Sequence, residues 1–535
     1  MKNIWMISRE YGDIAGAGGV KDVVCQLAEA LARWSGRSLH VVLPFYGFVE
    51  AEELGFEPLM EPLHHDQPLH LKIDMHQPDL EIWEEVRFFH KRAAKVHLYL
   101  VDALRYRQKA AVYTYTEGEE QREKWQKKSM GHHDYFAMNL LLQKAAIELM
   151  IVLQARPDVI HCHDGHTAIL PALLREIAGY RSYFRQTGCL VTVHNAGYGY
   201  HQEIADIPYA LAVTGLSERV VKDNQLDRKF DPFLVAGSYA VVNTVSENYA
   251  RELQETESDE LTGWLGHELK RRGVHLEGIT NGIDPALFSS SVLGGDEKEF
   301  LFTPGSEKDS LKGKKRYKQF FLNHFLENAE KCNVKHFGTL EADVHRPLFT
   351  FVGRLSDQKG IDTLLEVLPV FMKGNTKAQM VVLGTGSDAI ESRLKTLAGG
   401  DLQGRLCFLN GFSPMLANSV FGAGDFFTVP SRYEPCGLTD FIAQLFGSVP
   451  IVRHVGGLVK VVDEVTGIAY EGDSPTELLV ALERALTLFS DKFKMRTMQL
   501  RAVQEIEKKY TWSKVMQRYL HLYRRAQSAQ TDKYS

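Results

Sequence analysis

Apolar residues along this chain fall into short continuous runs that alternate with stretches of helical spacing. The first runs, Ile4–Ile7 and Leu39–Pro44, have the length of buried strands. Between them lie a glycine-rich segment, Gly12 to Gly19, and a pattern from Val20 to Leu31 that places its apolar residues on one helix face. This order of strand, loop, helix and strand predicts the opening of a doubly wound α/β sheet. The glycine spacing does not match the dinucleotide-binding fingerprint GxGxxG.

Polar residues of the first half gather directly after further apolar runs. Runs at residues 158–162, 190–193 and 240–245 are each followed by polar side chains. In open α/β sheets, ligands bind outside the carboxyl ends of the strands. These strand ends are therefore the candidate ligand side of the first sheet.

Three segments interrupt this alternation. Residues 50–100 are predicted to form a smaller strand-rich region, residues 105–133 loops or short helices, and residues 135–153 one long helix. Gly278–Asp284 is the expected crossing into a second domain. The segment 289–345 is rich in charge, and we predict that its cations line a solvated helix face: Lys312, Lys314, Lys315, Arg316 and Lys318.

The alternation starts again in the second half. Its strand-like runs are Leu348–Val352, Gln379–Leu383, Leu406–Leu409, Phe426–Val429 and Val449–Val452. Residues from Pro475 onward are predicted to be helical, ending in an amphipathic helix at Trp512–Arg525. The sequence thus predicts two Rossmann-like domains facing each other across a cleft, at 1–280 and 281–510, and a helix at 511–535 that packs back on the first domain.

Composition narrows the class of protein. The 535 residues are too many for one core, and a net charge of −6 argues against nucleic acid as the main partner. The N-terminus lacks the long apolar core of a signal peptide, and no apolar run has membrane-spanning length. Six scattered cysteines without a CxxC pair favour a reducing compartment over a disulfide framework. We expect a cytoplasmic protein without a membrane span.

The loop after Phe426–Val429 carries the clearest candidate chemistry. It spans Pro430–Asp440, contains the carboxylate of Glu434, and enters a helix at Gly437-Leu438-Thr439. A helix start offers N–H groups and a positive dipole end to an anion, and a carboxylate beside it suits sugar hydroxyls. A nucleotide sugar matches both features. An ordinary strand–loop–helix turn with a surface glutamate matches the loop equally well.

Two cations flank the end of the strand at 348–352. Arg354 offers a planar fork and Lys359 a point charge, so together they can clamp a diphosphate. The plainer alternative is a pair of surface cations near a turn.

Histidines mark the strand ends of the first half. His194 can hydrogen-bond a sugar hydroxyl or can be a satisfied strand-end histidine, and Asp164 and His166 share this ambiguity. His161 and His163 lie on one face of a strand and with His166 suggest a metal, but no second ligand cluster accompanies them. No metal site is therefore expected.

Together these motifs resemble bacterial glycogen synthases and plant starch synthases, retaining glucosyltransferases of the GT-B type (glycosyltransferase family 5). The stretch Glu434-Pro435-Cys436-Gly437-Leu438-Thr439 is highly specific for that family. The resemblance covers most of residues 1–525, and residues 50–130 and 289–345 match poorly. Other matching segments are Asn281–Asp284, Gly353–Leu355, Gln358–Gly360, Gly384–Gly386, Gly456–Leu458, His163-Asp164, Val191–Asn195 and Asn243–Ser246.

The resemblance implies a reaction and a set of site residues. ADP-glucose or UDP-glucose would donate glucose to the non-reducing 4-hydroxyl of an α-1,4-glucan, without a metal or other cofactor. Arg354 and Lys359 would bind the diphosphate and Glu434 the glucose hydroxyls, while His194, with Asp164 in the same catalytic set, would stabilise the oxocarbenium-like sugar. The implied donor-binding residues are Gly18, Gly19, Gly353, Gly384, Cys436, Gly437, Leu438 and Thr439.

Departures from the family pattern lie in the first half. The family's Lys-x-Gly-Gly loop is Gly16-Ala17-Gly18-Gly19 here, so its lysine is missing and Lys21 is the nearest cation. Backbone N–H groups of the glycines are then expected to reach phosphate. The family's Asp-Trp-His is Asp164-Gly165-His166, and Val235 replaces another lysine. The main hypothesis is an active glucosyltransferase. The alternative is a weak or silent member that binds glucan or nucleotide as a regulatory protein. The nucleotide base, the acceptor length and the oligomeric state stay open.

Overall fold

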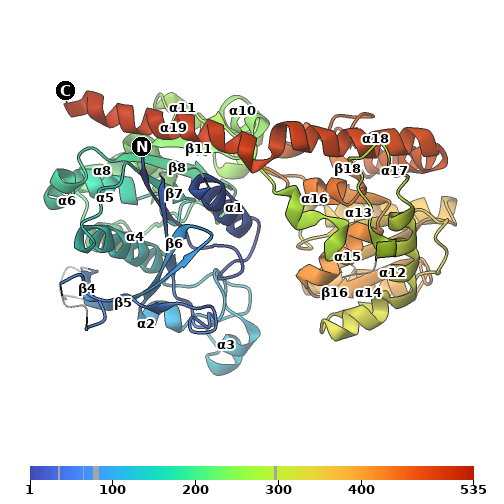
Figure 1. The fold of residues 1–535 in the computed structure, drawn as a ribbon, viewed down its shortest axis with the longest axis horizontal. Coiled ribbons are helices and arrows are strands. Elements are labelled where there is room, and N and C mark those ends of the chain that lie inside the picture. Colours follow the sequence, from blue (N-terminus) through green and yellow to red (C-terminus); the bar gives the residue numbers. More distant parts are fainter. Residues whose placement is uncertain (34–36, 64–65, 76–82, 294–297, 535) are drawn as a thin grey trace. The chain divides into compact units, whose positions relative to one another are not determined.

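The chain divides into two compact units, each built around its own sheet (Figure 1). A computed structural model describes residues 1–33, 37–63, 66–75, 83–293 and 298–534. Unit 1 comprises Met1–Gly282 and Trp512–Ser535, and unit 2 comprises Ile283–Thr511. The chain therefore leaves unit 1 once and returns to it with its last helix.

The sheet of unit 1 has the strand order β12-β11-β8-β7-β1-β2-β6-β5-β3, with β4 paired to β5. Strands from β12 to β6 run parallel, and β3, β4 and β5 are antiparallel to their neighbours. The chain enters at β1 and continues to both sides of it, so the strand order reverses there, where ligands bind in doubly wound sheets. The strands are β1 (Asn3–Ile7), β2 (Ser38–Pro44), β3 (Glu57–Pro58), β4 (His70–Asp74), β5 (Trp83–Ala93), β6 (Val96–Asp102), β7 (Val159–His163), β8 (Gly188–Val193), β11 (Val241–Thr244) and β12 (Glu277–Gly278), and a separate hairpin is formed by β9 (Gln225–Leu226) and β10 (Lys229–Phe230).

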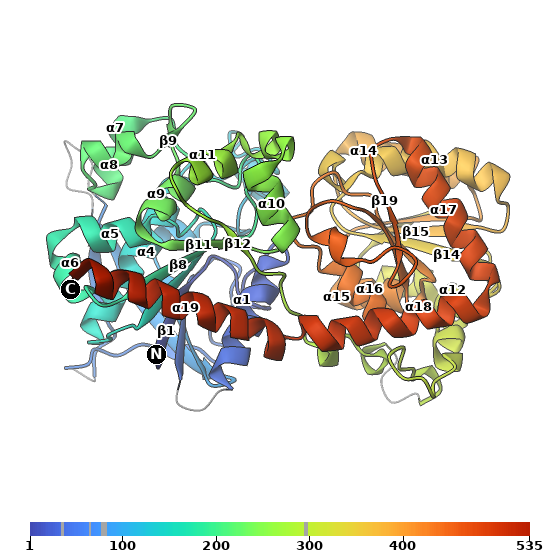
Figure 2. The same cartoon turned by 90° about the horizontal axis from the view of Figure 1, so that it is seen from above.

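Helices cover both faces of this sheet, and Figure 1 shows α4 and α19 on opposite sides of β7 and β8. Helix α19 lies along β8 and also contacts β7, β11 and α1. Figure 2 shows this helix from above along its length. The helices of unit 1 are α1 (Val20–Ala32), α2 (Leu104–Arg107), α3 (Glu117–Arg122), α4 (Tyr135–Val152), α5 (Leu170–Glu176), α6 (Ala178–Tyr183), α7 (Ile207–Thr214), α8 (Glu218–Asp223), α9 (Pro232–Tyr239), α10 (Glu247–Glu255), η1 (Glu257–Thr262), α11 (Leu265–Arg271) and α19 (Trp512–Tyr534).

Helix α4 corrects one expectation from the sequence. Among the described residues it is the helix long and apolar enough to cross a membrane, although no run of that length was expected. Of its residues, 78% are buried inside the protein, and the helix contacts β1, β2 and β4. Burial of this kind is typical of a core helix that is hydrophobic all round.

The sheet of unit 2 has the order β13-β16-β15-β14-β17-β18-β19, parallel except for β13. Five of its described strands, β14 to β18, match the predicted runs, whereas the short outer strands β13 and β19 were not predicted. The first of the parallel strands, β14, lies between β15 and β17, so the strand order reverses beside it as in unit 1. The strands are β13 (Lys335–Phe337), β14 (Leu348–Val352), β15 (Gln379–Gly384), β16 (Leu406–Asn410), β17 (Phe426–Val429), β18 (Val449–Arg453) and β19 (Ile468–Tyr470).

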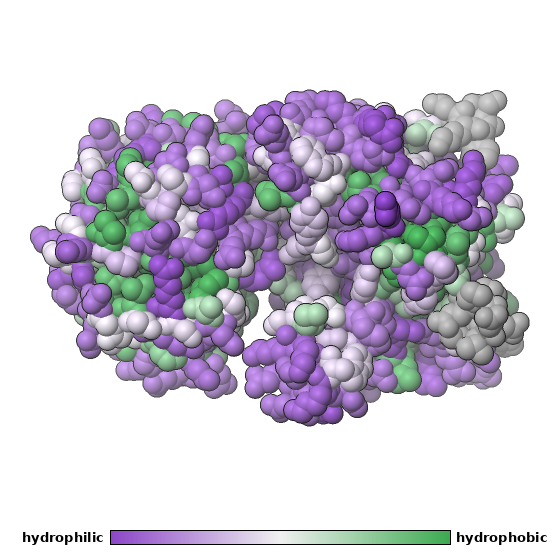
Figure 3. Space-filling view, turned by 180° about the vertical axis from the view of Figure 1, so that it is seen from behind, coloured by the Kyte–Doolittle hydropathy of each residue, from purple (hydrophilic) through white to green (hydrophobic). Residues whose placement is uncertain are grey.

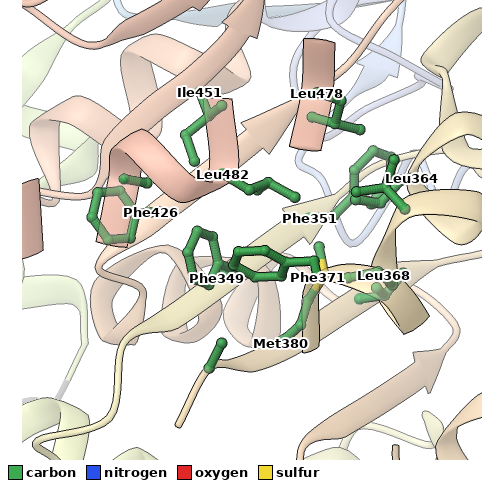
Figure 4. Packing of buried hydrophobic residues seen from close by; sticks show 14 of the residues in the cluster. Phe349, Phe351, Leu364, Leu368, Phe371, Met380, Phe426, Ile451, Leu478 and Leu482 are labelled. Atoms are coloured by element: carbon green, nitrogen blue, oxygen red, sulfur yellow. The ribbon is translucent and has the colours of Figure 1, made fainter. Parts of the chain in front are cut away.

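Alternating side chains of β14 contribute to the two large hydrophobic cores of unit 2, one on each face of its sheet. Phe349 and Phe351 pack on one face of the sheet against α13 and α17, as Figure 4 shows. Leu348 and Val352 point to the other face, under α12 and α15. Both faces being buried explains why these strands are continuous apolar runs. The helices are η2 (Pro285–Phe288), η3 (Ser290–Val292), η4 (Lys298–Phe300), α12 (Lys312–Lys331), η5 (Asp357–Lys359), α13 (Ile361–Gly374), α14 (Asp388–Gly399), α15 (Pro414–Ala423), α16 (Thr439–Leu445), η6 (Gly456–Lys460), α17 (Pro475–Ser490), α18 (Lys492–Glu505) and a π-helical turn η7 (Ile506–Tyr510).

The cation cluster of α12 is only partly a solvated face. Lys312, Lys315 and Arg316 are exposed as predicted, but the prediction is wrong for Lys314 and Lys318. Lys314 is buried and donates to the carbonyls of Gly422 and Phe446, each at 2.8 Å. Lys318 is buried as well and lies 2.6 Å from Asp425. The face of the molecule shown in Figure 3 is mostly hydrophilic, and its hydrophobic residues lie in separate patches.

Candidate functional site

Two loops meet where the strand order of unit 2 reverses. One follows β14 and the other follows β17, and the Arg432 N–H donates to the Gln358 carbonyl across them at 2.9 Å. Gly360 has φ +65°, and a Cβ there would lie 2.0 Å from the Pro430 carbonyl oxygen. Only glycine fits such an approach, so the sequence fixes the contact between the two loops.

This contact brings Lys359 and Glu434 together. Nζ of Lys359 donates to Oε2 of Glu434 at 2.5 Å, and the Ser431 hydroxyl donates to the same oxygen at 3.0 Å. The side chains are only 22% and 11% exposed. Burial alone would raise the pKa of Glu434, but the Lys359 ammonium, the Ser431 hydroxyl and Lys460 together lower that pKa below its ordinary value. Glu434 is therefore an ionised carboxylate, and its second oxygen and the remaining Lys359 protons are suited to hydroxyls and to an anion.

The other cations of these loops have different surroundings. Arg432 makes a bidentate pair with Asp362 at 2.7 and 2.8 Å and also donates to Asp473 at 2.8 Å. Its charge is used within the protein, so Arg432 holds the loop in shape. Arg354, the second predicted diphosphate residue, is exposed at the end of β14.

Backbone packing accounts for the predicted glycines at this end of the sheet. A Cβ on Gly384 would lie 1.9 Å from the Gly353 carbonyl oxygen, so the ends of β14 and β15 touch through glycine. Gly437 has φ +71° and is buried beside Cys436. Leu438 and Thr439 are half-buried at the start of α16. Contact of these residues with a donor stays a prediction.

Beneath this loop lies a buried ion pair that the sequence analysis did not single out. Nζ of Lys460 lies 3.1 Å from Oδ1 of Asp440, with side chains 4% and 0% exposed. Burial raises the pKa of Asp440 to about 6, against the opposing effect of Lys460. The ion pair could have been predicted from the lysine inside the apolar run Leu458–Val462, because a charge in such a run needs a buried partner.

In unit 1, Asp164 joins the ends of β7 and β8. Its Oδ1 accepts from the backbone N–H of His194 at 2.7 Å and of Asn195 at 3.3 Å. The residue has φ +60°, a strained conformation for a non-glycine residue. Burial raises its pKa to about 8, against the lowering effect of the two N–H donors. Asp164 thus fixes the backbone at His194.

Buried histidines extend from this point toward α19. Nδ1 of His163 lies 3.0 Å from Nε2 of His194, and burial lowers the pKa of both rings, that of His194 to about 3. His161, on the same strand face as predicted, contacts Tyr523 of α19 at 2.9 Å. The rings are therefore neutral, which suits hydrogen bonding to a hydroxyl. Within the described ranges, no group of three or more His, Cys, Asp or Glu side chains is arranged to hold a metal.

The glycine-rich loop after β1 is contacted by neighbouring side chains of the same unit. Oε2 of Glu10 accepts from the N–H of Ala17 at 2.7 Å and of Gly18 at 3.2 Å, so the Gly18 N–H that we expected to face phosphate has a protein partner. A Cβ on Gly16 would lie 2.3 Å from Cδ of Lys21. The Lys21 side chain thus folds back over the position where the family lysine is missing.

Lys21 remains a cation of this loop. Its Nζ lies 3.0 Å from Asp22 and 3.7 Å from the exposed Asp13. Its direction was not predictable from the sequence, because it depends on the empty space above Gly16. Gly19, also predicted to bind the donor, accepts from the Val23 N–H through its carbonyl.

Comparison with known proteins places both units in one family. Residues 3–268 match the starch synthase catalytic domain, and residues 346–487 match the glycosyl transferases of group 1. The glycogen synthase of Geotalea uraniireducens is 30% identical over 534 residues, covering 98% of each chain. The glycogen synthase of Vibrio cholerae is 28% identical and covers 98% of this chain and 99% of its own.

Solved structures agree on the fold. The catalytic domain of starch synthase IV from Arabidopsis thaliana, bound to ADP and acarbose, has a TM-score of 0.78 at 23% identity, covering 98% of this chain and 99% of its own. Sucrose-phosphate synthase from Thermosynechococcus elongatus has a TM-score of 0.57 at 17% identity, covering 99% of this chain and all of its own. The fold is thus the GT-B fold, and the chain belongs to the glycogen and starch synthase family of glycosyltransferases.

Proposed function

We propose that this protein transfers glucose from a nucleoside diphosphate glucose, with ADP-glucose preferred, to the non-reducing 4-hydroxyl of an α-1,4-glucan. The names of the relatives and the ADP and acarbose in the Arabidopsis structure support this assignment. The observation that carries it is the ionised Lys359–Glu434 pair at the strand reversal of unit 2. A cytoplasmic location belongs to the same proposal.

In the proposed reaction, the bond from glucose C1 to the diphosphate oxygen breaks and a bond from C1 to the acceptor oxygen forms. The electron pair stays on the diphosphate, and the hydroxyl proton goes to that leaving group. Lys359 and the exposed Arg354 neutralise the charge that develops there. Glu434 accepts from glucose hydroxyls, and neutral His194 hydrogen-bonds the sugar.

The experiment measures nucleotide release with glycogen and a panel of ADP-, UDP- and GDP-glucose. We expect the highest kcat/KM with ADP-glucose, and a loss of about 10²–10³ in kcat for Lys359→Ala. Glu434→Gln should lose turnover while keeping near wild-type affinity for free ADP, since its carboxylate serves the sugar. Absence of release with every donor, together with retained ADP or glycogen binding, would instead support a silent binding protein.

A further inference from the structure

A buried lysine lies directly beneath the loop that precedes α16. Nζ of Lys460 lies 2.6 Å from the Cys436 carbonyl oxygen and 2.8 Å from that of Gly437. It also lies 3.1 Å from both the Gly457 carbonyl oxygen and Oδ1 of Asp440. An ammonium has three donors, so these acceptors saturate it.

These contacts fix the direction of the neighbouring amides. In a trans peptide the C=O of one residue and the N–H of the next point in opposite directions. Because the Cys436 and Gly437 carbonyls point at Lys460, the N–H groups of Gly437 and Leu438 point away from it. The loop thus presents two adjacent N–H groups on the face opposite the buried ammonium, an arrangement that suits an anion.

Glycines clamp the loop from the same side. A Cβ on Gly457 would lie 2.1 Å from the Cys436 carbonyl oxygen, and one on Gly456 would lie 2.0 Å from that of Glu434. The Gly457 N–H donates to the Glu434 carbonyl at 2.9 Å. The segment that carries Lys460 therefore supports the loop at both Glu434 and Cys436.

We infer that Lys460 is a positioning residue for donor binding, which aims the Gly437 and Leu438 amides at the diphosphate of the donor. This inference rests on the proposed function. Asp440 is the counter-ion that makes the ammonium tolerable in the interior, and it is not itself a ligand of the donor.

The test separates positioning from stability by removing the Lys460 charge alone and then together with that of Asp440. Breaking a buried pair leaves an uncompensated charge, whereas replacing both partners with apolar residues is often neutral for stability. Lys460→Met should lower Tm and weaken ADP binding at least tenfold by calorimetry. The double variant Lys460→Met/Asp440→Leu should recover most of the Tm and keep the weakened ADP affinity. Recovery of ADP affinity together with Tm would overturn the inference.

Adenosine provides the second readout, because it has no phosphate. Its affinity should stay within about twofold of wild type in the double variant, since an effect aimed at phosphate leaves the base and ribose untouched. Equal losses for adenosine and ADP would show a general collapse of the site and would also overturn the inference.

Lys314→Met is the matched control. Lys314 is buried in the same unit and also binds two backbone carbonyls, those of Gly422 and Phe446. Its loss should lower Tm and leave ADP affinity unchanged, and a loss of ADP affinity equal to that of Lys460→Met would contradict the inference. If the wild-type protein binds ADP without transferring glucose, the proposed function fails while the effect of Lys460 on ADP binding stands. If it does not bind ADP, both fail.

Discussion

Asp164 is a buried acid whose two hydrogen bonds both end on Oδ1, so asparagine can keep them. Its pKa is about 8 in the folded protein and about 4 in an unfolded chain. The folded state therefore binds the proton more tightly, and stability that is present below pH 4 is lost as the pH rises through 8.

Asp164→Asn removes that loss. We expect the variant to be more stable than wild type by at least about 1 kcal/mol at pH 9, with the difference shrinking toward pH 4. Thermal unfolding across this range measures it. A Tm difference that is the same at every pH would show that the carboxyl group does not titrate in this range.

The position of the Lys21 side chain could not be predicted from composition and spacing. The sequence reveals that the family lysine is absent at Gly16, but only the structure shows the Lys21 stem lying over that position. A lysine–phosphate hydrogen bond contributes about 1.5–3 kcal/mol. Lys21→Met should therefore raise the KM for the donor roughly 10-fold or more, with unchanged Tm.

Lys222→Met is the control for that variant, since Lys222 is an exposed lysine of α8 paired to Glu218. It should leave the KM for the donor at the wild-type value. An unchanged KM in Lys21→Met as well would mean that the Lys21 charge interacts with Asp13, Asp22 and Glu10 and not with the donor.

Secondary-structure elements were predictable where burial on both faces leaves a continuous apolar run. Strands β14 and β17 begin and end at the predicted residues. Strand β13 is Lys-His-Phe and antiparallel at an edge, so no apolar run marks it. The buried face of α12 could have been predicted from the sequence, because Lys314 and Lys318 share helical spacing with Phe321 and Phe325. Charge alone misled the prediction there.

Helix α19 spans Trp512–Tyr534 and lies along β8. The close approach depends on Gly188, where a Cβ would lie 2.6 Å from the Ala526 carbonyl carbon. Gly188→Ala should cost about 1–3 kcal/mol, because neither backbone can give way without moving the helix.

The measurement is the free energy of unfolding in urea, with Gly179→Ala as the matched control. Gly179 lies in α6, and a Cβ there meets no atom within 4 Å. That variant should be neutral or more stable by about 0.4–1 kcal/mol. Equal destabilisation of both variants would rule out the contact with α19 as the cause.

The residues proposed to act in the reaction are divided between the two units of the chain. The donor-binding candidates Arg354, Lys359 and Glu434 and the positioning residue Lys460 lie in unit 2, whereas His194 and Lys21 lie in unit 1. The alternation of strands and helices was enough to predict two sheets. It did not reveal which buried charges support the donor loop, because that depends on contacts between residues far apart in sequence.

Unit 2 has the features of a domain that folds alone. It is one continuous segment, Ile283–Thr511, and the Ile283 N–H donates to the Tyr510 carbonyl at 2.8 Å, so its ends meet. Ile283 is buried with Phe441 and Ile506 in a small cluster at that junction. Expressed as residues 283–511, it should unfold cooperatively and still bind ADP, about tenfold more weakly than the full chain, because Arg354 and Lys359 are present and Lys21 of unit 1 is missing. It should release no nucleotide from ADP-glucose in the presence of glycogen, since His194 is absent. Lys359→Ala in the same segment should abolish ADP binding and keep the unfolding transition, whereas a folded segment with no affinity for ADP would show that unit 1 supplies essential donor contacts.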